Sequence, residues 1–540
     1  MLISQSNPVR DYRRISAVIF LFLYGVVGAA ADDLTRPIAA SVNGHFLVTP
    51  DGKPFFWLGD TAWEMFHRLD REETEFYLKD RARKGFNVIQ VVATGKLDYE
   101  GLTAPNRAGE IPFIDADPAR PNPRYFAHID WVVDRAAHYG IRMAILPIWN
   151  TLLTSRGDPS RAFDMRKAEL YGHWIAQRYR GKGVIWVLGG DMNPILPTGS
   201  TGHGDRSHGY TTTVDFRPLF DAMANGIASG EGGNPFITYH PSCCSTAAAA
   251  PPRMSLYFGD RDWFDMSLLQ SSHFQAYSGD YGGGGYVDGM DFGEAVGRGF
   301  VWNGFYNYLP VSDEYRAVPT RPVLDSEPRY EDHPIFINLR FESSGLWRAH
   351  DVRGALYQAL FAGAAGHTYG HFSVWDFYDP RRAAQTSPGY IDQAYGEVML
   401  QRSPWQQALD APAAGQMQHG KALLLSRPYF SRIPDQSLIS GAYGEGEGHM
   451  SATRDREGSY AMIYLPQGQP VTVDLTKLSG STVFAWWFDP RTGNATRIEG
   501  TFGTNQSQRL VPPTSGPEQD WVLVIDDTSK NYPAPGGARS

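Results

Sequence analysis

The feature that most limits the fold is an alternation of eight strand-like apolar runs with amphipathic helical stretches. The runs are short and rich in β-branched residues, as in strands buried on both faces of a parallel sheet. We place them at 55–59, 88–93, 143–149, 184–188, 236–240, 267–271, 322–324 and 368–374. Helical stretches between them lie at 71–84, 126–138, 167–180, 216–227 and 352–362. The alternation predicts an α/β fold, a (β/α)8 TIM barrel with insertions.

An open doubly wound sheet is the alternative, but it usually carries a Gly-rich phosphate loop after the first strand. This chain has no such loop. The segments 245–262 and 276–320 are rich in Gly, Tyr, Asp and Pro and predict long loops. In such a barrel, the loops after the strands build the active-site face, so these loops are expected to wall the substrate.

The two ends of the chain differ from its middle. Arg10, Arg13 and Arg14 precede an apolar run at 15–27, which is too short for the about 20 residues of a membrane span. We therefore expect a cleavable signal peptide at 1–31, a secreted or periplasmic protein and no membrane contact after cleavage. The barrel is expected at 32–410, and a C-terminal β-sandwich at 411–528 with strands at 422–426, 460–464, 471–475, 482–488 and 521–525. A hairpin turn is expected at 489–493 and a flexible tail at 529–540.

Composition excludes some classes of function. The net charge is −9 and no long basic run occurs, so we expect no nucleic-acid partner. Aromatic residues make up 13% of the chain, which fits both large cores and the stacking of sugar rings. Cys243 and Cys244 are adjacent, and with only His240 nearby they indicate structural thiols rather than a metal site. We expect no cofactor, and the sequence leaves the oligomeric state open.

Two acidic segments carry the chemistry. The run 184–194 contains Asp191 and the run 322–330 contains Glu327, each just after an apolar strand. Counted by strand, Asp191 ends the fourth and Glu327 the seventh, so both lie on the catalytic face of the barrel. Two carboxylates that flank one bond suffice to hydrolyse a glycoside. A separation of roughly 5–5.5 Å gives retention, and roughly 6.5–9.5 Å gives inversion.

The neighbours of the two acids indicate their roles. Arg329 and Tyr330 follow Glu327 and favour an ionised carboxyl, as a nucleophile requires. Asp191 follows an apolar strand and two glycines, a partly apolar setting of the kind expected for a general acid. Either acid alone also fits a helix cap or a salt-bridge partner. Asp325 is expected on the same side of its strand as Glu327, so only the terminal position favours Glu327.

Other polar and aromatic residues stand at strand ends. Asp60 fits a contact with a sugar hydroxyl and a cap of the next helix equally well, and several others fit barrel filling as well as sugar binding. The candidates for substrate binding are Asp60, Trp63, Trp149, His240, His273, Tyr330, His371 and Trp375.

Several of these motifs are familiar together. Six segments resemble the apiosidase-like catalytic domain of glycoside hydrolase family 140. They are residues 43–46, 54–63, 85–90, 186–191, 327–331 and 364–371. The resemblance covers roughly residues 40–410. The segments 432–436 and 487–491 resemble the β-domain that usually follows it and that carries a collagen-binding label, although nothing in these residues indicates collagen.

The resemblance implies a retaining, exo-acting glycosidase in which Asp191 is the acid/base and Glu327 the nucleophile. The activity characterised in that family is the release of apiose from a branched pectin, rhamnogalacturonan II. An Asp stands at the fourth strand where the wider clan more often has Glu, so the pocket must bring the substrate closer to this shorter acid. A non-catalytic carbohydrate-binding protein on a decayed barrel is the alternative, against which the intact acid pair speaks. A peptidase is disfavoured because the chain has neither His-Glu-x-x-His nor Gly-x-Ser-x-Gly.

Overall fold

The computed structural model describes most of the chain in ten pieces. These are residues 33–94, 102–149, 163–197, 213–242, 253–271, 273, 275–277, 300–335, 345–382 and 403–537. The predicted signal peptide and the two cysteines lie outside the described residues, as do parts of both predicted long loops. No helix within the described pieces has both the length and the apolar character that crossing a membrane requires.

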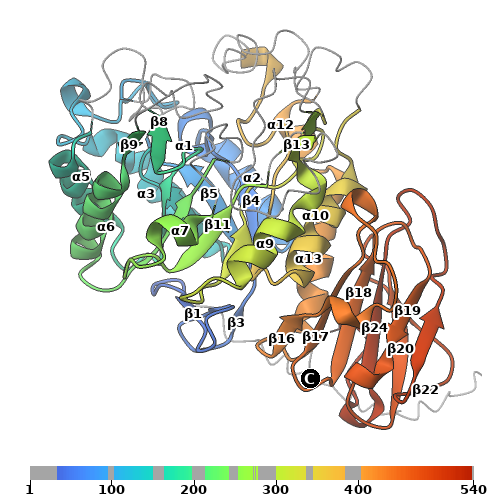
Figure 1. Cartoon of the computed structure of the whole chain (residues 1–540). Coiled ribbons are helices and arrows are strands. Elements are labelled where there is room, and N and C mark those ends of the chain that lie inside the picture. Colours follow the sequence, from blue (N-terminus) through green and yellow to red (C-terminus); the bar gives the residue numbers. More distant parts are fainter. Residues whose placement is uncertain are drawn as a thin grey trace, which may run out of the picture. The chain divides into compact units, whose positions relative to one another are not determined.

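Eight parallel strands form a nearly closed barrel (Figure 1). They are β4 (Trp57–Thr61), β5 (Val88–Val92), β6 (Arg142–Leu146), β7 (Ile185–Gly189), β10 (Phe236–His240), β11 (Met266–Leu269), β14 (Val323–Asp325) and β15 (Gly366–Tyr369). Their order in the sheet is β14-β11-β10-β7-β6-β5-β4-β15. The backbone N–H of Ala365 donates to Val323 O at 2.8 Å, which joins the two ends of the sheet. The predicted barrel is confirmed, with a strand at each of the eight predicted positions, although β15 shares only residues 368–369 with the predicted run 368–374.

Helices cover the outside of this barrel (Figure 1). The main ones are α2 (Arg71–Arg83), α3 (Pro123–His138), α5 (Met165–Tyr179), α6 (Arg217–Glu231) and α10 (Ala349–Phe361). Asp70 begins α2 with a capping box, in which its side chain accepts from Glu73 N–H and the Glu73 side chain accepts from Asp70 N–H. The predicted loops are only partly loops, since they hold α7 (Met254–Phe258), the hairpin of β12 (Gln275–Tyr277) with β13 (Phe300–Asn303), and α9 (Tyr308–Tyr315).

The barrel interior is a packed core. Trp57 is fully buried there, and its indole N–H donates to Thr368 Oγ1 at 3.1 Å across the β4–β15 pair. A Cβ on Gly366 would lie 2.2 Å from Trp57 O, so only glycine fits at this close approach. With the lower barrel filled, the chemistry is confined to the carboxyl ends of the strands.

The strand predicted at 422–426 is wrong. Residues up to Leu425 belong to helix α13 (Pro412–Leu425), which begins with proline at its first position. The carboxylate of Glu331 accepts from the N–H of Ala413, a favourable place for a negative charge at a helix start. A short apolar run reads alike in a strand and at the end of a buried helix, which explains the error.

The C-terminal region is an antiparallel β domain, which confirms the predicted class (Figure 1). Its larger sheet contains β16 (Arg432–Pro434), β17 (Ser451–Asp455), β18 (Tyr460–Leu465), β24 (Trp521–Asp527), β20 (Thr482–Phe488) and β21 (Ala495–Arg497), with β22 (Phe502–Gly503) paired to β20. A second ladder, β19 (Val471–Asp474) with β23 (Ser507–Leu510), packs its apolar side chains into the same core as β18, β20 and β24.

Two local features of the C-terminal region also bear on the predictions. The predicted hairpin turn is present between β20 and β21, where Gly493 N–H donates to Asp489 O at 2.8 Å. Within the predicted flexible tail, the Tyr532 hydroxyl lies 2.8 Å from Ser459 Oγ and its ring lies under the guanidinium of Arg427, while residues 538–540 lie outside the described residues.

Candidate active site

Strand β7 ends in a left-handed turn that carries Asp191 to the barrel mouth. Gly189, Gly190 and Asp191 have φ angles of 87°, 106° and 47°. A Cβ on Gly189 would lie 2.5 Å from His240 O, and one on Gly190 would lie 2.7 Å from the Trp149 ring. Only glycine satisfies both the angle and the space at these two positions. The pair of glycines therefore fixes where Asp191 leaves the strand.

Glu327 reaches the mouth because β14 stops two residues before it. Ser326 is held by its N–H, which donates to Leu269 O at 2.8 Å, and by its carbonyl, which accepts from Gln90 Nε2 at 3.0 Å. Glu327 then turns into the barrel mouth and is 4% exposed. Its position thus depends on contacts with β5 and β11.

Asp325 lies elsewhere, so its expected placement beside Glu327 is wrong. Its carboxylate accepts from Ser271 Oγ at 2.8 Å and from Asn307 Nδ2 at 3.1 Å. The regular strand ends at Asp325, and the alternation of sides does not continue past a strand end. Burial, opposed by these hydrogen bonds, raises the pKa of Asp325 to about 6.

The Glu327 carboxylate is surrounded by donors. His240 Nε2 lies 2.9 Å from Oε2 and His273 Nε2 lies 3.0 Å from Oε1. The Tyr330 hydroxyl donates to Oε1 at 2.5 Å and the Trp63 indole N–H at 3.4 Å. Burial raises the pKa of Glu327, but the hydrogen bonds from His240 and His273 and the charges on these rings outweigh it, so the pKa lies well below the usual range. Glu327 is held in its ionised form.

His240 stands between the two acids. Its Nδ1 lies 3.9 Å from Asp191 Oδ1, while its Nε2 contacts Glu327. One carboxylate oxygen of each acid and one His240 ring nitrogen all lie within 4.8 Å of one another. Burial lowers the pKa of His240, but the bond to Glu327 and the two negative charges outweigh this and raise it. The two carboxylates are thus close together, with a cation-forming group against both.

Aromatic rings line the same place. The Trp63 ring lies 5.3 Å from the Trp149 ring and meets His240 edge-on at 5.2 Å. The His273 ring lies 3.8 Å from that of Tyr330. The structure therefore brings seven predicted site residues together: Asp191, Glu327, Trp63, Trp149, His240, His273 and Tyr330.

Trp375 is half-buried and packs against the inner barrel core, which also contains Trp63 and Trp149 of this cluster. Two predicted substrate contacts lie apart from the cluster. One is His371, which faces the outer side of its loop, with Nε2 3.6 Å from the Asp332 carboxylate, and lines a cavity of about 700 Å³ that Asp191 and Glu327 do not line. The other is Asp60.

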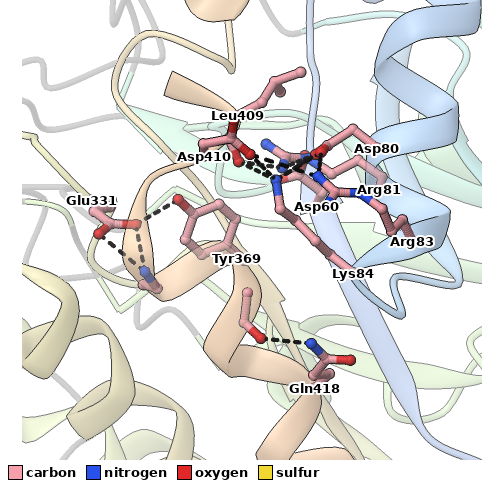
Figure 2. Close-up of polar contacts among 12 residues, drawn as sticks. Asp60, Asp80, Arg81, Arg83, Lys84, Glu331, Tyr369, Leu409, Asp410 and Gln418 are labelled. Carbon is pink, nitrogen blue, oxygen red and sulfur yellow. Dashed lines mark hydrogen bonds and ion pairs between the residues drawn. The ribbon is translucent and has the colours of Figure 1, made fainter. Parts of the chain in front are cut away.

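Asp60 points out of the barrel, into a buried ion pair. Its Oδ2 accepts from Arg81 Nε at 2.5 Å and from the Tyr77 hydroxyl at 2.6 Å, and both acid and guanidinium are fully buried. Figure 2 shows Arg81 joined both to Asp60 and to Asp80, beside Lys84. This contact is neither of the two roles expected from the sequence, because alternate residues of β4 face opposite sides of the sheet.

We expect Asp60→Asn to destabilise the fold without touching the substrate. Removal of the charge takes away the fully buried partner of Arg81 and leaves the guanidinium, among the described residues, only its ion pair with Asp80, which costs about 3–5 kcal/mol of unfolding free energy. Urea denaturation measures the loss, and KM of the folded fraction stays unchanged. Asp410→Asn is the matched control, because its carboxylate is 77% exposed in its pair with Lys84 and such surface pairs contribute about 1 kcal/mol or less. A raised KM with unchanged stability in Asp60→Asn contradicts this assignment.

Three polar residues near the site were not among the predicted ones. Gln90 is the polar residue within the apolar strand Val88–Val92, and that exception is a usable signal. Asn193 is fully buried two residues after Asp191. His333 packs 5.3 Å from the His273 ring, and burial lowers its pKa well below the usual range. Nothing in the sequence near Asn193 or His333 indicates these positions.

The ionisation of Glu327 and His240 sets a window of pH. The pKa of Glu327 is lowered, so its contribution to stability is present above the unfolded value of about 4.3 and is lost as pH falls through the folded value. The pKa of His240 is raised, so its contribution is present below the unfolded value of about 6.5 and is lost as pH rises through the folded value. Both contributions are present together between these two unfolded values.

We expect His273→Gln to move the acid limb of kcat/KM to higher pH by about one unit, the value of one charge-assisted hydrogen bond. The reason is that the ring then no longer stabilises the Glu327 carboxylate. Initial rates are measured from about pH 3 to about pH 9, a range that contains the reference pKa values of Glu and His. They give the position of the acid limb of kcat/KM. His371→Gln is the control, since this ring is more deeply buried than His273 but contacts Asp332, and an equal shift there contradicts the account.

Comparison with known proteins agrees with this geometry. Residues 41–431 match the family described as "Apiosidase-like, catalytic domain", and residues 433–526 match "Putative collagen-binding domain of a collagenase". A solved structure titled "Glycoside hydrolase" is 30% identical with a TM-score of 0.74, covering 92% of this chain and 98% of its own. A glycoside hydrolase family 5 structure from Bacteroides vulgatus is 29% identical with a TM-score of 0.74, covering 93% and 96%. A search of curated proteins gave no significant match.

A barrel with this acid pair, and with these relatives, defines a glycoside hydrolase that acts on a carbohydrate substrate. Within that class, the chain belongs to the apiosidase-like family, whose catalytic domain spans most of its length.

Proposed function

We propose that the chain is a retaining exo-glycosidase in which Glu327 is the nucleophile and Asp191 the acid/base. The observation that carries the proposal is the close approach of the two carboxylates, with oxygens within 4.8 Å of each other and of His240. Such a short distance between the nearest oxygens favours the roughly 5–5.5 Å carboxyl separation of retaining enzymes over the roughly 6.5–9.5 Å that leaves room for a water.

The reaction has two steps. Ionised Glu327 attacks the anomeric carbon while Asp191 gives its proton to the leaving glycosidic oxygen, which forms a glycosyl ester on Glu327 and releases the aglycone. Asp191, now ionised, takes a proton from water, and the hydroxide displaces Glu327 from the sugar. Each step inverts the anomeric carbon, so the product keeps the configuration of the substrate.

The residues around Glu327 support its role. His273 and Tyr330 supply hydrogen bonds, and His240 an ion-pair contact, that keep the carboxylate ionised and aimed at the mouth. Trp63 and Trp149 offer flat apolar rings beside both acids, the kind of surface on which a sugar ring stacks. Binding and chemistry are thus assigned to one place.

The substrate that we propose is a pectic polysaccharide or oligosaccharide of the plant cell wall, from which the enzyme releases apiose. The support is the resemblance to glycoside hydrolase family 140 and the match to the apiosidase-like family. We further propose that residues 1–31 direct export to the periplasm or medium, which amino-terminal sequencing of the secreted protein tests.

A screen of the full chain against aryl glycosides and pectic oligosaccharides tests the activity. Release of apiose from the end of a branched pectic fragment supports the proposal. Release of another sugar leaves the glycosidase assignment intact and overturns the apiose one. Binding without turnover on every substrate supports instead a carbohydrate-binding protein on an inactive barrel.

A further inference from the structure

The C-terminal domain shares a hydrophobic core with the barrel. Helix α10 contributes Val352, Leu356 and Leu360 to a buried cluster that also contains Met462 and Val524 of the C-terminal sheet. Such a continuous core is typical of parts that fold together rather than of a tethered module. The C-terminal domain is therefore packed against a helix that itself covers the catalytic barrel.

Specific polar contacts hold α10 to the sheet. Arg353 donates to both carboxylate oxygens of Asp520, at 2.9 and 2.7 Å, and the two side chains are almost fully buried. The Tyr357 and Tyr464 rings stack with centroids 5.0 Å apart. A buried two-point ion pair fixes orientation because its geometry admits little variation.

Gln358 connects this interface to the catalytic loop. Its Nε2 donates to the carbonyls of Gly446 and His449 in the C-terminal domain, each at 3.3 Å. Its Oε1 accepts from Arg329 Nη2 at 3.4 Å, and the side chain is 1% exposed. With its NH₂ turned to two carbonyls of the C-terminal domain, the amide must present its oxygen to Arg329.

Arg329 acts on the catalytic loop differently from the sequence expectation. Its buried guanidinium lies over the rings of Phe305 and Trp347, 5.2 and 5.5 Å from their centroids, while Glu327 takes its hydrogen bonds from other residues. Contacts of this kind stabilise the orientation of both partners when they are buried. Arg329 thus fixes the Trp347 ring.

Trp347 in turn fixes His273. Its indole N–H donates to His273 O at 2.5 Å, and its backbone N–H donates to His333 O at 3.0 Å. His273 then places Nε2 3.0 Å from Glu327 and Nδ1 2.7 Å from Pro328 O. An unbroken series of contacts joins the C-terminal domain to the nucleophile.

We propose that the C-terminal domain positions the nucleophile, with Gln358 and Arg329 as positioning residues that hold Trp347 and His273 against Glu327. This inference rests on the proposed role of Glu327. It assigns the domain a part in catalysis, in place of an independent binding module.

The test compares Gln358→Met and Arg329→Met with Asp520→Asn in the full chain. Methionine keeps the bulk of each side chain and removes its hydrogen bonds. We expect kcat to fall about tenfold, KM to stay within about twofold, and the acid limb of kcat/KM to move up by about half a pH unit, because His273 then holds Glu327 less firmly. Asp520→Asn destabilises the same interface but leaves the limb in place.

Hydrogen–deuterium exchange of residues 323–335 gives a readout that needs no activity. We expect faster exchange in both methionine variants than in Asp520→Asn, at a temperature where all are folded. The proposal is overturned if the methionine variants change neither the acid limb of kcat/KM nor the exchange of residues 323–335. It is also overturned if Asp520→Asn changes both as much as they do. If the methionine variants exchange faster but the wild-type chain hydrolyses no glycoside, the proposed function is contradicted while the positioning contacts remain supported.

Discussion

Glu327→Gln is expected to lower kcat by about four to six orders of magnitude, the range seen when a nucleophile is removed. Glutamine has the same size, and its one oxygen accepts the hydrogen bonds that Oε1 accepts from His273 and Tyr330, so the pocket stays formed. An uncharged amide does not attack the anomeric carbon. Initial rates on the best aryl glycoside measure the loss, and circular dichroism checks the fold.

Glu331→Gln is the matched control for this substitution. It changes the same type of side chain four residues further along the loop, where the carboxylate accepts from the Tyr369 hydroxyl and from the start of α13 (Figure 2). We expect Glu331→Gln to lose stability and to keep kcat within about threefold, since it alters no group that we assign to the transition state. Activity of Glu327→Gln within tenfold of the wild type excludes Glu327 as the nucleophile.

Asp191→Asn is expected to lower turnover by about two to four orders of magnitude on substrates with poor leaving groups. Sugar and alkyl leaving groups need a proton as they depart, and asparagine has none to give. Aryl glycosides with acidic phenols leave without one, so their first step is expected to lose far less. The measurement is therefore the ratio of the loss in turnover on substrates with poor leaving groups to the loss on aryl glycosides with acidic phenols.

Asp332→Asn provides the control for Asp191. Both residues have positive φ angles, 61° and 47°, a region in which asparagine is tolerated as well as aspartate, so neither substitution strains the backbone. Asp332 pairs with Arg348 on the outer side of the loop, and its replacement is expected to leave the substrate ratio unchanged. If Asp191→Asn slows both types of substrate equally, general acid catalysis by this residue is contradicted.

The sequence was sufficient for the barrel and for the meeting of the two acids. Eight apolar runs have the period and length of buried strands, and parallel strands carry their carboxyl ends to one face. Asp191 and Glu327 follow two such strands directly, so their approach required only a strand count. The same strand count also predicts that Trp63, Trp149, His240 and His273 lie at the barrel mouth.

The contacts that could not be predicted depend on the direction in which a side chain points and on partners far away in the sequence. Asp60 stands at a strand end like the other candidates, but it points outward to Arg81. Asp325 does not face the same side as Glu327, because the regular strand ends at Asp325 and the alternation of sides does not continue to Glu327. Arg329 is expected from its position to favour the ionised form of Glu327, but its guanidinium lies over the rings of Phe305 and Trp347. Local patterns specify the element, whereas these contacts are decided by residues far along the chain.

The anomeric configuration of the first product, followed by NMR during hydrolysis, tests the central claim most directly. The claim is that Asp191 and Glu327 stand close enough for Glu327 to bond to the sugar, with oxygens within 4.8 Å of each other. The account predicts that the released sugar first appears with the configuration it had in the substrate. First appearance of the opposite anomer would contradict it.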